Sequence, residues 1–412
     1  MSSQQSPPLP PHTHFIKAIA ANINYWQAKI GHWTDTDMAN FLQEQANLLI
    51  AVEMGLVMPE TRGATAELLL TAFPFIERCG TREKWLPLWE TAVSQNVAPI
   101  GVLPIKLLNR LGQLLRLGNQ LEQAIAIHQK SQTLATQLQN KQALAEAWFN
   151  LSEIYRLKRE YEKAETYGQK ALAFFNCQTD QARWQATLLN TMGLIALDCD
   201  ECLQAEARLR ESVALWQLLD EPTELARVLK NLGLALQQQQ KYIAAYQYYH
   251  EALEQLRRTE SELDKALIIL NIGTLHFVQG EYRQAELAFL QVNRINKQHI
   301  WNLTLQAMVA QNLGNSLLSQ KRLVEAETYL QQAKTLWQQL GDSLNLANTL
   351  GTLGEVYQAQ NAVKAAIINY DEALSLLTEY PEHPWATKLR HNFTNTRASL
   401  RQVHKKSGQL AS

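Results

Sequence analysis

The chain has 412 residues, of which 46% are hydrophobic and 19% are charged, and its formal net charge is −1. This near-neutral balance excludes a global field that would attract nucleic acid or an acidic membrane surface. No run of about 18 apolar residues occurs, so no intrinsic membrane anchor is predicted. Gly and Pro are scarce while Ala, Leu, Gln and Glu dominate, which favours helices over a sandwich or a barrel.

The N-terminal stretch "MSSQQSPPLPPHTH" lacks the basic and apolar regions of a signal peptide. Its Ser, Gln and Pro residues predict a disordered tail over residues 1–11. Four Cys in a chain of this length do not form a disulfide scaffold, so a cytoplasmic location is expected.

Residues 12–104 are predicted to form an N-terminal helical region without a long linker. Two helices are expected at about 12–30 and 36–56, with Thr34 or Asp35 capping the second helix and Thr61 capping the next one. Residues 64–95 resemble a degenerate copy of the repeat that follows them, with Trp85 and Leu86 near the position of a recurring Ala.

Seven copies of a repeat of 40 or 41 residues occupy residues 105–382, and we number them repeats 1 to 7. A small residue follows an apolar one in each copy: Gly112, Ser152, Gly193, Gly233, Gly273, Gly314 and Gly354. Twelve residues later every copy has Ala: Ala124, Ala164, Ala205, Ala245, Ala285, Ala326 and Ala366. A third position, seven residues further, is Ser131, Ala171, Ser212, Ala252, Val292, Ala333 or Ala373.

Apolar residues recur at helical spacing within the copies, as in "WFNLSEIY" and "AETYGQKAL". Each copy is therefore predicted to be a helix hairpin, in which the small residues let the two helices approach closely. One hairpin cannot bury its apolar faces alone, so the copies are predicted to stack into an α-solenoid. Residues 383–406 continue the phase through Thr394 and are predicted to form a polar capping helix, followed by a tail at 407–412.

This pattern of small residues resembles the tetratricopeptide repeat family, whose usual unit is about 34 residues. The longer period is similar to that of kinesin light chains, Pins-type polarity adaptors and bacterial Rap-type regulators. The resemblance covers residues 105 to about 380 and implies an all-α, right-handed superhelix of helix hairpins. It says little about function, because this fold serves many partners.

A polar residue stands two positions before each small residue: Arg110, Asn150, Thr191, Asn231, Asn271, Asn312 and Thr352. Asn is unfavourable inside a helix because its amide competes for backbone hydrogen bonds. The position is rotated about 200° from the small residue, on the helix face turned away from the second helix. Helical spacing adds further residues to this face: Arg227, Leu234 and Gln238 in repeat 4, Leu267, Thr274 and Val278 in repeat 5, and Met308, Asn315 and Ser319 in repeat 6.

In a tetratricopeptide solenoid this face lines the concave groove, where Asn commonly holds the backbone of an extended peptide. The resemblance therefore implies partner contact by Asn150, Asn231, Asn271 and Asn312, and the sequence departs from it at Arg110, Thr191 and Thr352. One Asn amide carries an acceptor and two donors, so it can pair with a peptide backbone without reading its sequence. The alternative interpretation is that these Asn bond between neighbouring helices and shape the superhelix.

The rest of the groove would set specificity. Its middle is apolar, with Leu194, Leu234, Leu267, Val278 and Met308, whereas its first repeats carry Lys106, Arg110, Arg116 and Arg156 opposed by Glu146 and Glu153. We expect a partner segment with apolar side chains and with acidic residues near the first repeats, although ordinary packing between repeats would also explain the Leu and Met residues. A clamp for a terminal carboxylate is not expected, because Thr187 and Thr191 stand where cations are needed.

No catalytic, nucleotide-binding or metal-binding motif is evident, so no enzyme activity, metal or cofactor is predicted. Cys199 and Cys202 form a C-x-x-C pair, but no second pair completes a zinc site, and Cys202 is expected to be a buried structural thiol. Six cations from Lys388 to Lys406 without any Asp or Glu could meet an acidic partner or simply solvate the capping helix.

Three functions compete at this point. The first is a non-enzymatic scaffold that binds a partner segment in the groove, and the second is a peptide-switched regulator of Rap-like architecture. The third is an assembly factor for a larger complex. If that complex lies in a membrane, the chain would be recruited there by its partner. The sequence does not identify the partner or the oligomeric state.

Overall fold

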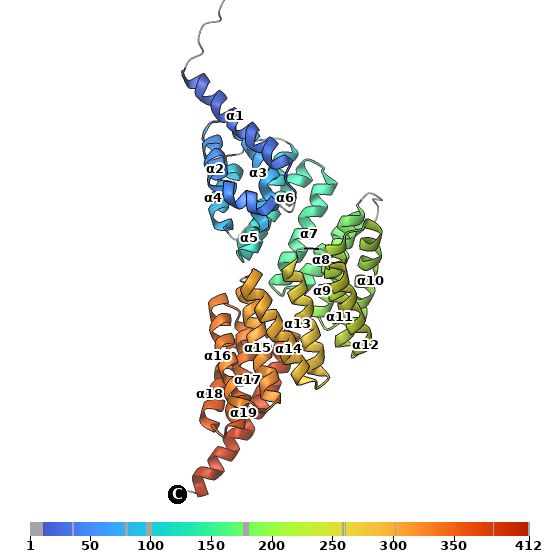
Figure 1. The fold of residues 1–412 in the computed structure, drawn as a ribbon, viewed down its shortest axis with the longest axis vertical. Helices are drawn as coiled ribbons and strands as arrows, with labels where there is room; N and C mark the ends of the chain where they lie inside the picture. The colour runs from blue at the N-terminus through green and yellow to red at the C-terminus, as the bar shows by residue number, and fades with distance from the viewer. Residues whose placement is uncertain are drawn as a thin grey trace, which may run out of the picture. The chain divides into compact units, whose positions relative to one another are not determined.

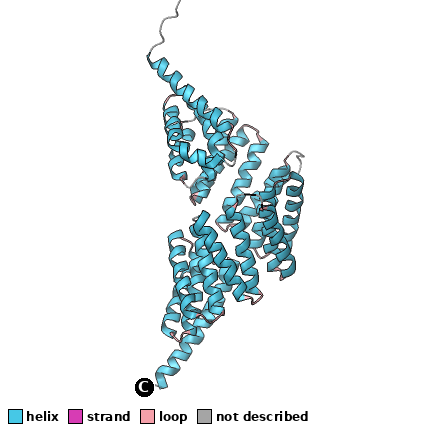
Figure 2. Ribbon diagram, viewed as in Figure 1, coloured by secondary structure: helices cyan, strands magenta, loops and turns pink. Residues whose placement is uncertain are grey.

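The structure is a computed structural model that describes residues 11–34, 37–78, 81–95, 101–175, 181–257, 259, 261–300, 302–381 and 383–410. Every regular element within these residues is a helix (Figure 2), which confirms the all-α prediction. The chain divides into two compact bodies, which we call the N-terminal body (residues 1–180) and the C-terminal body (residues 181–412).

The N-terminal body contains four helices before the repeats (Figure 1): α1 (Pro11–Gly31), α2 (Met38–Val57), α3 (Arg62–Arg78) and α4 (Arg82–Ser94). Their core is aromatic, because Phe41 stacks on Phe75 and on Trp85 with ring centroids 5.4 and 5.9 Å apart. Trp85 and Trp89 are fully buried. The region that the sequence marks as a degenerate repeat thus supplies much of this core.

The expected caps of these helices need correction. Thr34 does not cap α2, because that helix begins after Asp37, whose carboxylate accepts hydrogen bonds from the backbone and the hydroxyl of Thr34. Asp35 lies outside the described residues. Thr61 directly precedes α3, but its hydroxyl donates to the carbonyls of Gly55 and Met58 at the end of α2.

Each of the seven repeats is a pair of helices, and successive helices pack against one another within each body. Repeats 1 and 2 lie in the N-terminal body as α5 (Val102–Leu117), α6 (Leu121–Gln137), α7 (Lys141–Leu157) and α8 (Tyr161–Phe175). Repeats 3 to 7 lie in the C-terminal body as α9 (Ala182–Asp198), α10 (Cys202–Leu219), α11 (Pro222–Gln238), α12 (Tyr242–Gln255), α13 (Glu262–Val278), α14 (Tyr282–Ile295), α15 (Leu303–Ser319), α16 (Leu323–Leu340), α17 (Ser343–Ala359) and α18 (Val363–Leu376). The chain continues into α19 (Pro384–Leu410), which extends past the end expected for the capping helix.

The small residue of each first helix receives a side chain from the second helix, sixteen positions later in the sequence. A Cβ added to Gly233 would lie 2.6 Å from Cε1 of Tyr249, and one added to Gly273 would lie 2.5 Å from Cε1 of Phe289. Both distances are far below van der Waals contact, so only glycine fits between these helices. Repeat 2 reverses the arrangement: Ser152 takes the place of the glycine, and Gly168 takes the place of the large residue.

The turn between the two helices of every repeat uses one left-handed residue, seven positions after the small residue: Asn119, Arg159, Asp200, Gln240, Gly280, Lys321 and Asn361. The next residue then donates a backbone hydrogen bond back into the first helix, as Lys241 N does to Leu236 O at 2.9 Å. This is the Schellman termination of a helix. All seven repeats therefore join their two helices by the same kind of turn.

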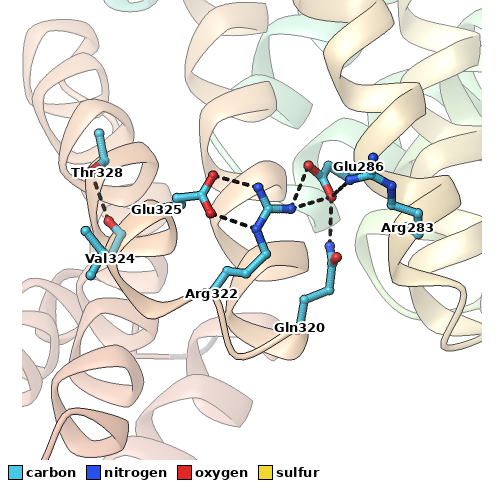
Figure 3. Close-up of polar contacts among 7 residues, drawn as sticks. All are labelled: Arg283, Glu286, Gln320, Arg322, Val324, Glu325 and Thr328. Carbon is cyan, nitrogen blue, oxygen red and sulfur yellow. Dashed lines mark hydrogen bonds and ion pairs between the residues drawn. The ribbon is translucent and has the colours of Figure 1, made fainter.

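Two glutamates, buried Glu286 and partly buried Glu206, join neighbouring repeats in the C-terminal body. Glu286 of α14 accepts hydrogen bonds from Gln320 at 3.0 Å and from Arg322 at 2.9 Å, both from the turn of the next repeat (Figure 3). Glu206 of α10 accepts in the same way from Gln239 at 2.9 Å and Lys241 at 3.0 Å. We call these two arrangements inter-repeat clasps.

The cations of α19 are used within the C-terminal body. Arg397 and Arg401 both pair with Asp371 of α18 at 2.7 Å, and Arg390 donates to the carbonyls of Leu377 and Tyr380. Lys388 pairs with Asp200 at 2.6 Å, in the turn of repeat 3. The capping helix therefore contacts both its neighbouring repeat and one that lies 188 residues earlier in the sequence. The side chains of Lys405 and Lys406 lie outside the described part.

Candidate functional site

The candidate site is the face of each first helix that is turned away from its second helix. The small residue of each pair faces the second helix. Successive residues of a helix are rotated by about 100°, so the residues that lie about 100° to 160° around the helix from the small residue form the opposite face. We call this the groove face. It holds the residue two before each small residue together with the residues six before, one after and five after it.

Two of the four Asn on the groove face are buried and bonded to the neighbouring first helix. Asn231 is 6% exposed, and its Nδ2 donates to Oδ1 of Asn190 on α9 at 2.8 Å. Asn150 is 2% exposed; it donates to the carbonyl of Glu146 at 2.9 Å and accepts from Gln113 of α5 at 3.4 Å. These contacts match the alternative role, in which Asn joins neighbouring helices.

The other two Asn differ. Asn271 and Asn312 are half-buried, and neither makes a side-chain hydrogen bond within the part of the chain that the structure describes. Close to Asn312 in the same helix, the Oδ1 atom of Asn315 is buried without a hydrogen-bond partner. Repeats 5 and 6 therefore present amide groups whose hydrogen-bonding capacity is unused in this structure.

The two arginines expected to contact a partner already have partners of their own. Arg227 pairs with Glu224 at 2.6 Å and with the buried carboxylate of Asp264, on α13, at 3.0 Å. Arg110 donates to Gln113 at 2.8 Å, and its guanidinium lies 4.7 Å from the ring centroid of Phe73. Both side chains remain partly open to solvent, but recruiting them would break these contacts.

The apolar residues of the groove face are partly buried in the hydrophobic core. Leu234, Leu267 and Met308 pack against the clusters formed by neighbouring repeats. Three other large apolar side chains on α13 and α15 are exposed: Leu263 at 40%, Val278 at 46% and Leu303 at 49%. The hydroxyl of Thr274 donates a hydrogen bond to the carbonyl of Leu270 at 3.0 Å. Repeats 5 and 6 thus combine unpaired amides with exposed apolar area.

Charges on the groove face of the N-terminal body are arranged differently. Burial raises the pKa of Glu146, while Gln142, Arg110 and Lys106 act against that rise. Arg116 lies 3.6 Å from Glu153.

In the C-terminal body, Glu355 of α17 stands one residue after Gly354, and nothing opposes the rise that burial causes in the pKa of its carboxyl. Glu355 could have been found from the sequence, because the spacing that selects Leu234, Thr274 and Asn315 also selects it.

Other candidate chemistry finds no support among the described residues. No three His, Cys, Asp or Glu side chains there come together as a metal site, and no helix there is both long and apolar enough to cross a bilayer. Cys199 and Cys202 are only partly buried, so the expectation of a buried thiol at Cys202 is wrong. The Sγ of Cys202 lies 3.2 Å from Oε1 of Gln238, next to the turn that joins α9 to α10.

These features define a solenoid of helix pairs, each closed by a small residue and a Schellman turn. The model of the tetratricopeptide repeat family matches residues 104–176, 224–298 and 304–393, more than half of the chain. The chain belongs to the tetratricopeptide repeat family, which confirms the resemblance and the α-solenoid fold. This fold supports a protein-interaction adaptor or regulator in general terms. The comparison with curated proteins found no match.

Solved structures with the same fold include bacterial regulators. The apo form of the quorum sensor NprR from B. thuringiensis is 15% identical, with 88% of this chain and 99% of that chain covered and a TM-score of 0.59. Aspartyl phosphate phosphatase F from Bacillus subtilis is 15% identical, with 90% and 96% covered and a TM-score of 0.54. A Rap protein complexed with competence and sporulation factor is 14% identical, with 83% and 98% covered and a TM-score of 0.52. At these identities the likeness concerns the fold alone.

Proposed function

We propose that the chain is a non-enzymatic scaffold that binds an extended segment of a protein or peptide along the groove face of the C-terminal body. The observation that carries the proposal is the pair Asn271 and Asn312, half-buried and without a side-chain partner within the described residues. An extended segment offers N–H and C=O groups at regular intervals, and each Asn amide can meet one of each.

Exposed apolar area on one of the helices that carry these amides supports the same proposal. Val278 lies on the groove face of α13, five residues after Gly273, and Leu263 is exposed on the same helix, so apolar side chains of the segment could cover them. Burial of apolar area contributes roughly 25 cal/mol per Å² before the costs of association. The amides would then fix the direction and register of the segment, whereas the apolar contacts would supply most of the affinity. Asn150 and Asn231 take a structural role in this proposal.

A display experiment tests the proposal directly. A library of random twelve-residue peptides is panned against the full chain, and the dissociation constant of an enriched peptide is measured by fluorescence anisotropy. The double variant Asn271→Ala/Asn312→Ala is expected to bind this peptide about 10- to 100-fold more weakly, as the loss of two to four hydrogen bonds implies.

Two glutamines on the second helices provide the matched control. Gln247→Ala/Gln291→Ala removes two exposed amides from α12 and α14 and should leave the affinity unchanged. Enrichment of no peptide by the wild-type chain, or equal loss in both double variants, would count against the groove face as a binding site. Circular dichroism verifies that all variants keep their helix content.

The second candidate is a regulator whose shape changes when a peptide binds. The ion pair between Lys388 and Asp200 favours it, because it links α19 to the turn of repeat 3 and could open or close with the curvature of the C-terminal body. Small-angle scattering separates the two functions: a peptide that changes the radius of gyration indicates the regulator, and an unchanged radius indicates the scaffold.

A further inference from the structure

Glu355, on the groove face of the C-terminal body, carries a charge that no described cation balances. The residues directly after the small residues of repeats 4 to 7 are Leu234, Thr274, Asn315 and Glu355. Glu355 is exposed, and within the described residues it has no hydrogen bond and no ion pair. This sets it apart from Glu146 of the N-terminal body, which has Arg110 and Lys106 nearby.

The surroundings of Glu355 are unfavourable for a free carboxylate. Although the side chain reaches solvent, the protein packed around it raises the pKa of its carboxyl, and no cation contributes the opposite effect. On α18, Tyr370 is 1% exposed and its hydroxyl has no hydrogen-bond partner. Burial and, secondarily, the charge of Glu355 raise the pKa of that hydroxyl, so the two groups lie close to each other.

A second acceptor without a donor stands at the same position of the adjacent repeat. Asn315 Oδ1 is buried and unpartnered on α15, and α15 contacts α17. Packed helices lie about 8–10 Å apart, so Asn315 and Glu355 flank a single span of the groove face. Both present oxygen acceptors, and together they need a ligand that offers several donors.

We propose that this end of the groove face binds a positively charged residue of the partner segment, a Lys or Arg side chain or a terminal amino group, between Glu355 and Asn315. The inference rests on the proposed function and adds the charge of the segment to it. An ammonium group offers three donors and a guanidinium five, and both lack acceptors. Pairing with either one gives a charge-assisted hydrogen bond to a carboxylate that has no cation of its own among the described residues.

The spacing of the repeats also sets where the basic residue lies in the segment. First helices of neighbouring repeats are about 8–10 Å apart, and an extended chain advances about 3.3 Å per residue. Each repeat therefore spans about three residues of the segment. We expect the basic residue about three positions from a residue held over α15 and about six from one held over α13.

The experiment uses the random twelve-residue library panned against the wild-type chain, Glu355→Gln and the control Glu251→Gln. Glu251 is an exposed glutamate on α12, so its variant changes net charge equally. The wild-type chain and the control should enrich peptides with Lys or Arg at one aligned position next to apolar residues. Glu355→Gln should enrich the apolar residues without the basic one.

A double-mutant cycle gives the size of the effect. One enriched peptide is compared with a copy in which the basic residue is replaced by Gln. The wild-type chain should bind the neutral copy about 10-fold more weakly, whereas Glu355→Gln should bind both copies equally. Circular dichroism and the melting temperature show that Glu355→Gln is folded.

The outcomes separate this inference from the proposed function. Peptides that depend on Asn271 and Asn312 but show no basic preference would overturn the inference and leave the proposed function standing. A Glu355→Gln variant that loses basic and neutral peptides alike would also overturn it. Enrichment of nothing by the wild-type chain would overturn both.

Discussion

Repeats 1 and 2 of the N-terminal body and repeats 5 and 6 of the C-terminal body share the same sequence pattern but use it differently. In the first pair the polar groove-face residues are satisfied within the chain, since Asn150 bonds to Gln113 and Arg110 lies over Phe73. In the second pair Asn271 and Asn312 have no side-chain partner among the described residues. The role of a repeated Asn is therefore decided by the residue that the preceding repeat offers to it.

The contact inside each helix pair shows a similar contrast. Repeats 4 and 5 close with glycine against Tyr249 or Phe289, whereas repeat 2 closes with Ser152 against Gly168. The hydroxyl of Ser152 donates to the carbonyl of Ala164 at 2.7 Å, which satisfies a polar group in the space that a large ring fills elsewhere. Four substitutions test how these differences between the repeats affect stability.

The largest effect is expected where a methyl group has no room. Gly233→Ala should lower the free energy of unfolding by about 2–3 kcal/mol, because the new Cβ lies 2.6 Å from Tyr249, and this should outweigh the better helix propensity of Ala. Gly63→Ala, in α3 where nothing lies within 4 Å of the new Cβ, should be neutral or slightly stabilising. Urea denaturation measures both, and equal effects would refute the packing argument.

A pH-dependent effect is expected in repeat 1, where His128 packs on Gly112. Burial, aided by the charge of Arg116, lowers the pKa of His128 to about 3, and neither ring nitrogen has a partner. The unfolded chain takes up a proton at this histidine below about pH 6.5, but the folded chain does not until about pH 3, so stability falls as the pH drops between these values. His128→Leu should remove this loss and gain about 2 kcal/mol at pH 5 relative to pH 7.

Leu occupies the position of His128 in repeats 3 and 6, as Leu209 and Leu330, so the substitution copies packing that the chain already contains. The exposed His32 of the same body serves as the control, and His32→Leu should show no comparable gain at low pH. If wild-type and His128→Leu proteins lose stability in parallel between pH 7 and pH 5, His128 does not titrate as described.

The inter-repeat clasps should give a smaller, acid-dependent effect in the C-terminal body. Burial alone would raise the pKa of Glu206. The hydrogen bonds from Gln239, Lys241 and Arg210 outweigh that effect and lower the pKa to about 2. The stabilisation is therefore complete above about pH 4.5 and is lost as the pH falls toward 2. Glu206→Gln should cost about 1–2 kcal/mol at pH 7 and less at pH 3. Glu211→Gln, exposed on the same helix, should cost little at either pH.

The smallest effect separates the two kinds of Asn. Asn231→Ala should lower the free energy of unfolding by about 1 kcal/mol, because it leaves Oδ1 of half-buried Asn190 without its donor. Asn271→Ala should change it by less than about 0.5 kcal/mol, since no side-chain bond in the described structure is lost. The reverse order in chemical denaturation would show that Asn271 has a structural role.

The sequence predicts the fold well, because each helix pair is closed by residues that lie near each other in the chain, as Gly233 and Tyr249 do. It does not predict which Asn are already bonded, because the partners Gln113 and Asn190 lie 37 and 41 residues away in another repeat. Nor does propensity reveal that α2 begins after Asp37, since Thr34 is also among the residue types favoured as a cap. Residues that meet only through stacked repeats require the structure.

The ion pair of Lys388 with Asp200 has a consequence for how the C-terminal body unfolds. An array whose repeats contact only their neighbours behaves as a one-dimensional lattice, and its ends fray independently. This contact spans 188 residues and connects the first repeat of the C-terminal body to its last helix. Fraying at one end therefore also breaks a contact of the other end. Its side chains are 65% and 56% exposed, and such pairs weaken as salt shortens the Debye length. Ionic strength should therefore tune the cooperativity of unfolding more than the stability itself.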